Sequence, residues 1–234
     1  MPERAPHPGL LRDRYDGLLI ANGTPPKSVL LRMLRARADH LIALDGGVDA
    51  LKTIRMVPDV VAGDLDSASA NAVSWARDNG ARVRRLPSQD APDIAKGLRL
   101  CRDYGLRMIL VAGFSGARTD HVLASLGFAF AVRGMEVTLI TDEVIALPLR
   151  GRVEREFHVP ARHSISWLGY PQAGPCTLAG VRWPFRNRAL RLDGFHSLSN
   201  RAAGPSVHVR QGAGRSILFV SLFPQGHGKS APLE

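Results

Sequence analysis

Cysteine, lysine and long apolar runs are all scarce in this chain of 234 residues. The two cysteines, Cys101 and Cys176, lie far apart and in no metal-binding spacing, which predicts reduced, inert thiols rather than a disulfide scaffold. No stretch approaches the roughly 20 apolar residues that cross a membrane. No apolar segment near Met1 is typical of a signal peptide. We therefore expect a cytoplasmic protein with no membrane partner.

Acidic charge is outweighed by basic charge, which arginine mostly carries. The net charge is +10 and the sequence pI is about 10.7, a balance that raises nucleic acid as a partner. The arginines are scattered, however, and no long basic run is interleaved with aromatic residues. We therefore expect no nucleic-acid partner. A positive field also suits a polyphosphate substrate, because it steers anions toward a cleft.

The first two-thirds of the chain alternates strand and helix patterns. Short apolar runs predict strands at 17–23, 40–44, 59–62, 82–86, 108–112 and 136–141. Helical spacing of apolar residues predicts helices near 26–38, 48–54, 70–79, 92–104 and 119–132. This alternation predicts an α/β fold, with an open, mostly parallel sheet and helices on both faces.

The pattern changes near residue 143, where helical periodicity ends. Short alternating runs follow, separated by Gly and Pro, at 164–168, 176–179, 206–210 and 216–220. They predict a smaller all-β sandwich. We expect domains at 15–147 and 148–224, with loose termini at 1–14 and 225–234.

Acidic residues collect where the predicted strands end. Asp45 follows the second strand, and Asp64 and Asp66 follow the third. Ligands of an open parallel sheet bind beyond the carboxyl ends of its strands, so these residues should share one edge. An extended backbone would point Asp64 and Asp66 to the same side, with Leu65 in the core. Clustered carboxylates need a cation between them, and Mg²⁺ prefers such oxygen ligands.

Each of these acids taken alone is more simply a turn former or a helix cap. The segment from Ser88 to Lys96 leaves two interpretations open. Asp90 can cap a helix while Asp93 and Lys96 form an i, i+3 ion pair. Alternatively, Asp93 binds the metal and Lys96 binds a phosphate.

A glycine-bearing turn at 113–121 precedes another predicted helix, and a helix N-terminus of this kind binds anions. Arg118 offers a bidentate phosphate donor. Asp120 and His121 suit substrate binding or proton transfer; the alternative is that Asp120 caps the helix and His121 is an ordinary imidazole. Neither G-x-G-x-x-G nor the P-loop motif occurs, so a nucleotide would be held in another way.

Five short motifs occur together in one order. They are Asp45-Gly-Gly47, Gly63-Asp-Leu-Asp-Ser67 preceded by Pro58-Asp59, Gln89-Asp90-x-x-Asp93-x-x-Lys96, Gly113-x-x-Gly-x-Arg-x-Asp-His121 and Ser197-Leu-Ser-Asn200. This order resembles the thiamine pyrophosphokinase family over about residues 18–223, and Gly180-Val-Arg-Trp183 is similar to a further family segment.

The resemblance implies a homodimer that transfers pyrophosphate from ATP to the hydroxyl of thiamine, leaving AMP. By position, it implies that Asp64, Asp66 and Asp93 hold Mg²⁺, with Asp45 and Asp90 nearby. The implied nucleotide and substrate residues are Gln89, Lys96, Arg118, Asp120 and His121. Ser199 and Asn200 would contact the pyrimidine of thiamine. Asp93 or Asp120 would take the hydroxyl proton.

Three positions depart from the family pattern, which usually has an acid at Ser88, Thr at Pro92 and Gly at Ala117. Pro92 removes a hydroxyl and a backbone donor beside Asp93. Two alternatives therefore stay open: a pyrophosphokinase that acts on another alcohol, and a thiamine- or nucleotide-binding regulator without turnover.

Overall fold

The computed structural model describes residues 10–86, 91–116 and 118–224. This part of the chain divides into an α/β unit, Arg12–Asp142, and an all-β unit that contains Glu143 onward together with Leu10 and Leu11. The boundary expected at residues 147 and 148 falls inside a strand, β7 (Val144–Arg150). Within the described ranges, no helix is long and apolar enough to span a membrane.

The α/β unit is built on one parallel sheet, as the alternating pattern predicts. Every neighbouring pair of its strands is parallel, in the order β6-β5-β1-β2-β3-β4. The strands are β1 (Tyr15–Ile20), β2 (Ala38–Leu44), β3 (Val60–Gly63), β4 (Arg82–Arg85), β5 (Met108–Ala112) and β6 (Glu136–Ile140).

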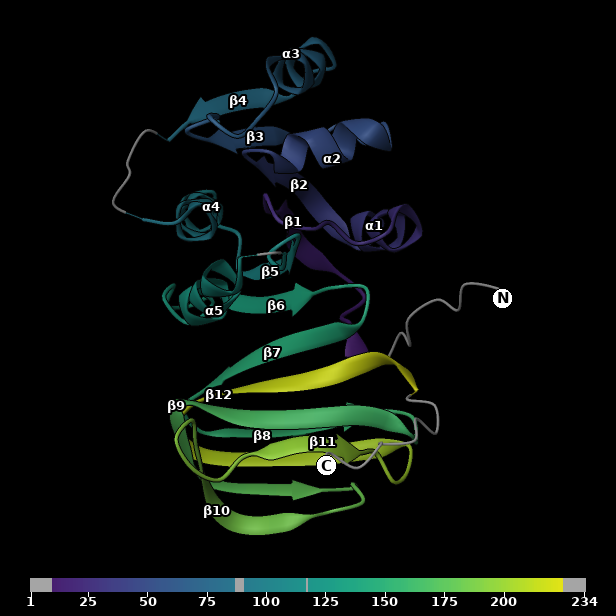
Figure 1. Ribbon diagram of the computed structural model, residues 1–234, viewed down its shortest axis with the longest axis vertical. Helices are drawn as coiled ribbons and strands as arrows, with labels where there is room; N and C mark the ends of the chain where they lie inside the picture. The colour runs from purple at the N-terminus through teal and green to yellow at the C-terminus, as the bar shows by residue number, and fades with distance from the viewer. Residues whose placement is uncertain (1–9, 87–90, 117, 225–234) are drawn as a thin grey trace, which may run out of the picture. The chain divides into compact units, whose positions relative to one another are not determined.

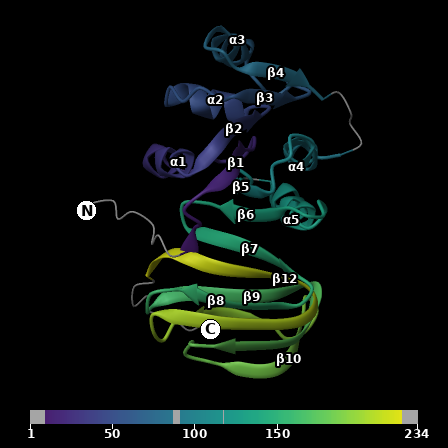
Figure 2. The same ribbon diagram turned by 180° about the vertical axis from the view of Figure 1, so that it is seen from behind.

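Helices cover both faces of this sheet (Figures 1 and 2). They are α1 (Ser28–Arg35), α2 (Gly47–Thr53), α3 (Ala70–Asp78), α4 (Asp93–Asp103) and α5 (Thr119–Phe128). Helices α1 and α2 lie on one face and α4 and α5 on the other. Ile94, Leu98 and Cys101 recur at helical spacing along α4 and are all buried, because this stripe faces the sheet.

The order of the strands places a crevice between β1 and β5. Strands β1 to β4 succeed one another in one direction, whereas β5 returns to the other side of β1. The chain leaves the carboxyl ends of β1 and β5 toward opposite sides of the sheet, and such a switch point is where open α/β sheets bind ligands. The fold thus positions a site before any side chain is considered.

The all-β unit is entirely antiparallel and depends on two long strands, β9 (His163–Ala179) and β12 (Ser206–Pro224). These two pair along most of their length. Strand β12 also pairs with β7 and with β8 (Val153–His158), while β9 pairs with β10 (Phe185–Arg191) and β11 (Ser197–Arg201).

The sequence pattern divided both long strands in two. The runs at 164–168 and 176–179 belong to β9, and those at 206–210 and 216–220 belong to β12. Gly174, Pro175 and Gly214 fall between the predicted runs but lie within the strands, and the register of the β9–β12 ladder shifts between Gly214 and Ser216. Glycine and proline therefore mark irregular strand positions here rather than strand ends.

A series of buried hydrogen bonds between polar side chains links β9, β12 and the turn after β7. The fully buried Trp167 donates its indole Nε1–H to Ser216 Oγ at 2.7 Å, and Ser216 Oγ donates to Gln211 Oε1 at 2.5 Å. Gln211 Nε2 in turn donates to the carbonyl of Gly151 at 2.8 Å. Every member of this series is satisfied, which is what makes a buried polar group tolerable.

We predict that Ser216→Ala lowers the free energy of unfolding by about 1–3 kcal/mol, because the Trp167 donor and the Gln211 acceptor lose their shared partner. Urea unfolding followed by tryptophan fluorescence measures this. The matched control is Ser206→Ala in the same strand, whose hydroxyl makes no hydrogen bond within the described residues. Equal losses from the two substitutions would contradict the role assigned to the network.

Candidate active site

Three carboxylates converge at the carboxyl ends of two neighbouring strands. Asp45 directly follows β2, and Asp64 directly follows Gly63 at the end of β3, with Asp66 two residues later. One oxygen atom from each of these three side chains lies within 4.8 Å of the other two. We call these residues the acidic cluster. Parallel pairing of β2 with β3 produces it, because the two strands end at the same edge.

Asp45 is the buried member of the acidic cluster, with only 1% of its surface exposed. Its Oδ1 accepts the backbone N–H of Leu65 at 2.9 Å, but its buried Oδ2 has no hydrogen-bond partner within the described residues. Burial, with the charges of Asp93 and Asp64, raises the pKa of Asp45 from 3.8 to about 6, although the Leu65 N–H opposes the shift. An unsatisfied buried oxygen beside other carboxylates is a fit for a cation.

The backbone around Asp45 is bent tightly to place that carboxylate. Asp45 and Leu65 both have positive φ, at 44° and 68°, so the segment from Asp64 to Asp66 is not extended. The expectation that Leu65 turns into the core is wrong, since this side chain is only half-buried. Gly63 has φ of 141°, and a Cβ atom there would lie 2.0 Å from Asp45 Oδ1. Glycine is therefore required at this position.

Lys96 joins the acidic cluster to Asp93. Its side chain is nearly buried, and its Nζ lies 3.0 Å from Asp93 Oδ1 and 3.3 Å from Asp64 Oδ2. Burial lowers the pKa of Lys96, but hydrogen bonds to Asp93 and Asp64 more than offset this and raise it. The pKa of Asp64 is lowered, first by the N–H of Asp66 and then by Lys96. The i, i+3 ion pair, one of the two interpretations that the sequence left open, is present, and Lys96 also pairs with Asp64.

A cleft of about 650 Å³ opens beside these side chains. Asp64, Asp66, Asp93 and Lys96 line it, together with the loops that follow β1 and β5. This size is typical of small-molecule sites. The cleft therefore lies at the switch point of the sheet, where the topology predicts a ligand.

Arg118 and Asp120 form an ion pair at the start of α5. Arg118 Nη2 lies 2.6 Å from Asp120 Oδ2, and the side chains are 70% and 63% exposed. This hydrogen bond lowers the pKa of Asp120 to about 2. Asp120 does not cap α5, whose N-cap is Arg118 without a side-chain cap bond. Arg118 and His121 line the cleft.

Two further predicted site residues, Gln89 and Asp90, lie outside the described residues, as do Ser88 and Ala117. Pro92 is described, and it is the N-cap of α4. Asp93 is thus the first residue of this helix, where a carboxylate suits the helix dipole.

Ser199 and Asn200 lie in β11 of the all-β unit and differ sharply in exposure. Ser199 is exposed and has φ of 51°. Asn200 is buried, and its amide bonds the backbone N–H and carbonyl of Trp183 at 3.1 and 2.7 Å. Its Oδ1 also accepts the N–H of Arg201 at 2.9 Å. The side chain of Asn200 thus fixes the segment around Trp183, and its predicted contact with thiamine stays a prediction.

The loop after β1 is also part of the site, which the sequence alone did not predict. Asn22 and Gly23 line the cleft beside Ser115, which follows β5. The N–H of Gly23 donates to the carbonyl of Gly113 at 2.6 Å, and a Cβ on Gly23 would lie 2.3 Å from the carbonyl of Ser115. The Asn22-Gly23 pair at the end of the first apolar run indicated a turn in the sequence. Only the strand order shows that this turn lies beside the loop after β5 and lines the cleft.

The fold and the site define an α/β protein with an acidic cleft at the switch point of a parallel sheet and an all-β unit after it. Residues 31–140, which cover most of the α/β unit, match the family model for the thiamin pyrophosphokinase catalytic domain. Thiamine pyrophosphokinase 1 of Arabidopsis thaliana is 26% identical over 167 residues, and its namesake in Oryza sativa is 26% identical over 174. Both comparisons support assignment of the chain to the thiamine pyrophosphokinase family.

The matched region covers 66% of this chain and 62% of the Arabidopsis protein, so the chain spans under two-thirds of that relative. Solved structures are similar in fold across both units. A yeast thiamin pyrophosphokinase superposes with a TM-score of 0.78 at 17% identity, covering 92% of this chain and 89% of that one. One from Bacillus subtilis gives 0.76 at 19% identity, covering 88% and 98%.

We predict that Asp45→Asn stabilises the metal-free protein at pH 7 by about 1–3 kcal/mol. The folded pKa of Asp45, about 6, lies above its ordinary value of 3.8. This group therefore favours folding below about pH 4, and that contribution is lost as the pH rises through 6. Asparagine keeps the Leu65 hydrogen bond and removes the buried charge.

Urea unfolding in chelator at about pH 4 and pH 7 measures this effect. The difference between the two proteins should nearly vanish at the lower pH. Asp13→Asn, which removes an exposed carboxylate, is the control. Destabilisation by Asp45→Asn at pH 7 would contradict the assignment of Asp45 as an uncompensated buried acid.

Proposed function

We propose that this protein is a thiamine diphosphokinase, which transfers the β,γ-pyrophosphoryl group of ATP to the hydroxyl of thiamine and releases AMP. The match of residues 31–140 to the family's catalytic-domain model supports the reaction class. The single observation that supports catalysis by this chain is the buried, unpartnered Oδ2 of Asp45 within the acidic cluster. A protein that only retained the fold would have no reason to keep this unfavourable charge.

Magnesium is the proposed cation, held by Asp45, Asp64 and Asp66. Their oxygens are the hard ligands that Mg²⁺ prefers, and Asp45 Oδ2 has no hydrogen-bond donor within the described residues. Asp93, expected from the resemblance to be a ligand, is not among the residues whose oxygens lie within 4.8 Å of one another, and we propose it as a neighbour of the metal site. When bound, Mg²⁺ neutralises charge on the phosphate oxygens.

The side chains of the chain position the reactants and share the remaining charge. Lys96 orients Asp64 and Asp93 and presents its ammonium group toward the cleft. Arg118 offers a guanidinium group to a phosphate at the start of α5. Arg118 also holds the pKa of Asp120 at about 2, which makes Asp120 a poor proton acceptor. We therefore propose Asp93 as the group that accepts the hydroxyl proton of thiamine.

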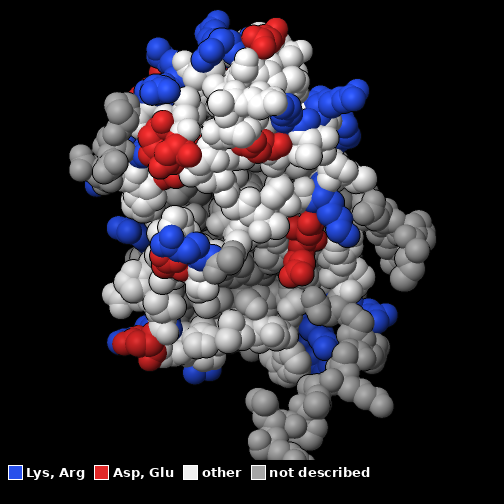
Figure 3. Space-filling model, turned by 45° about the horizontal axis from the view of Figure 1, so that its top comes forward, with Lys and Arg blue, Asp and Glu red and all other residues white. Residues whose placement is uncertain are grey.

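Two other functions stay as outcomes of the test: transfer to another alcohol, and ligand binding without turnover. Nucleic-acid binding is disfavoured by the distribution of charge. On the face that Figure 3 shows, lysine and arginine side chains occur in small groups beside acidic ones, without a continuous basic surface. Two buried free thiols, Cys101 and Cys176, fit the cytoplasm as the proposed site of action.

We predict that the purified protein converts ATP, Mg²⁺ and thiamine into equal amounts of AMP and thiamine diphosphate, measured by chromatography. Chelation of Mg²⁺ should abolish both products. If AMP forms only when another alcohol replaces thiamine, that alcohol is the acceptor and thiamine is not. Ligand binding without AMP would assign a regulator and reject the enzyme.

A matched pair of variants connects this activity to the cleft. Lys96→Met keeps the length of a nearly buried side chain but removes the charge between Asp64 and Asp93, and we expect a loss of about 100-fold or more in kcat. Lys52→Met removes a lysine that does not line the cleft and should leave kcat unchanged. Equal kcat values for the two variants would show that Lys96 does not contribute to the reaction.

We further propose that the protein acts as a homodimer. Each unit exposes large apolar side chains, including Leu123 on α5 and both Trp183 and Leu198 in the all-β unit. The family resemblance implies the homodimer, and these exposed side chains are the proposed contact residues.

Light scattering is expected to give twice the chain mass of 25.4 kDa. Leu123→Glu and Leu198→Glu, tested separately, should shift at least one preparation toward the monomer, whereas Ala70→Glu, at a small exposed residue of α3, serves as a control. A monomeric wild-type protein at micromolar concentration would refute the dimer.

A further inference from the structure

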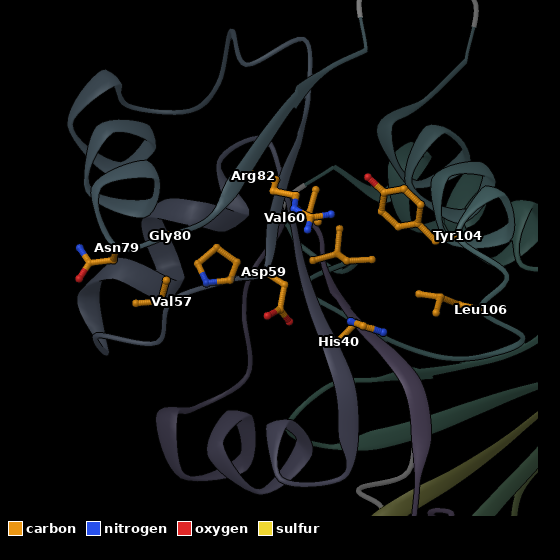
Figure 4. Close-up of a pocket in the computed structure, with 11 residues that line it drawn as sticks. His40, Val57, Asp59, Val60, Asn79, Gly80, Arg82, Tyr104 and Leu106 are labelled. Atoms are coloured by element: carbon orange, nitrogen blue, oxygen red, sulfur yellow. The ribbon is translucent and has the colours of Figure 1, made fainter.

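The α/β unit has a second hollow, of about 640 Å³, at the opposite edge of its sheet. His40, Asp59 and Arg82 line it from the amino ends of β2, β3 and β4 (Figure 4). Strands β2 and β3 run from this edge to Asp45 and Asp64 at the other. The hollow is therefore separate from the acidic cluster, and nothing in the proposed reaction uses it.

Apolar side chains form part of the lining. Ile42 and Val60 are nearly fully buried, and Pro58 is also buried. Tyr104, which follows α4, presents its ring with 41% of its surface exposed. A flat aromatic ring beside an apolar surface is a platform on which another ring stacks.

Hydrogen-bond donors and acceptors surround this apolar surface, as Figure 4 shows for Arg82, Asp59, His40 and Tyr104. The Arg82 guanidinium and the Tyr104 hydroxyl make no hydrogen bond or ion pair within the described residues. Asp59 Oδ2 accepts the N–H of Leu41 at 2.7 Å, while its Oδ1 has no donor in that part of the chain. The hollow thus offers both unused donors and an unused acceptor.

The charges around the hollow nearly cancel. Helices α3 and α4 end beside it, at Asn79 and Tyr104, and the negative ends of their dipoles oppose the positive charge of Arg82. Arg35 Nη2 lies 3.9 Å from Asp59 Oδ2 and balances that carboxylate. A polyphosphate would therefore gain little electrostatic stabilisation in the hollow, and a cation would be repelled by Arg82. The electrostatics favour an uncharged polar ligand.

We propose that this hollow binds an uncharged planar heterocycle of the nucleobase type. The ring stacks on Tyr104, a ring acceptor takes a hydrogen bond from Arg82, and a ring N–H or amino group donates to Asp59 Oδ1. Nucleobases carry such donors and acceptors on one edge and a π-face for stacking. The proposal does not depend on the proposed catalytic function, because it involves none of the catalytic side chains.

The test uses adenosine, guanosine, cytidine and uridine, each titrated into the full-length ¹⁵N-labelled protein in chelator. We expect at least one nucleoside to shift the amide signals of residues around His40, Arg82 and Tyr104. Its 5′-monophosphate should bind no more tightly than the nucleoside. A nucleotide held at the acidic cluster would behave oppositely, since it requires both phosphate and Mg²⁺.

Matched variants locate the binding. Arg82→Gln and Tyr104→Ala should each weaken it about fivefold or more, and Tyr104→Phe should restore most of the stacking. Arg84→Gln removes an exposed arginine of the same strand that does not line the hollow, and should have no effect. All substituted side chains are exposed, so folding is preserved. No binding at millimolar nucleoside, or binding that Arg82→Gln and Tyr104→Ala leave unchanged, would overturn the proposal.

Discussion

The carboxylate of Asp45 is the constraint on which the site depends. A buried acid with one unpartnered oxygen is unfavourable, and two more carboxylates beside it increase the cost. Local backbone geometry holds the carboxylate in this position. Asp45 and Leu65 have left-handed backbone, and residue 63 is a glycine because a Cβ there would collide with the carboxylate. Strain stored in this way fits a site that a cation completes.

The rest of the α/β unit serves to hold that arrangement. Parallel pairing brings the ends of β2 and β3 together, and α4 adds Lys96 between Asp64 and Asp93. The reversal of strand order between β1 and β5 opens the cleft next to them. Lysine and the proposed magnesium ion thus divide one task, since each compensates carboxylates that would otherwise repel one another.

Much of this was accessible from the sequence because it depends on local pattern. Strand and helix alternation predicted the parallel sheet, and the positions of Asp45, Asp64 and Asp66 after apolar runs predicted their shared edge. The left-handed backbone at Leu65 was not predictable, because it is imposed by a contact with Asp45, twenty residues earlier in the chain. The continuity of β9 and β12 was also missed, since glycine and proline within long irregular strands resemble strand ends.

The number of protons released when Mg²⁺ binds, measured by calorimetry in buffers of different ionisation enthalpy, tests the central claim most directly. Metal binding requires an ionised ligand, and Asp45 has a pKa of about 6 whereas the pKa of Asp64 is lowered. The account predicts release of close to one proton at about pH 5, falling toward none at about pH 8. Magnesium binding without proton release at the lower pH, or release that persists in Asp45→Asn, would contradict it.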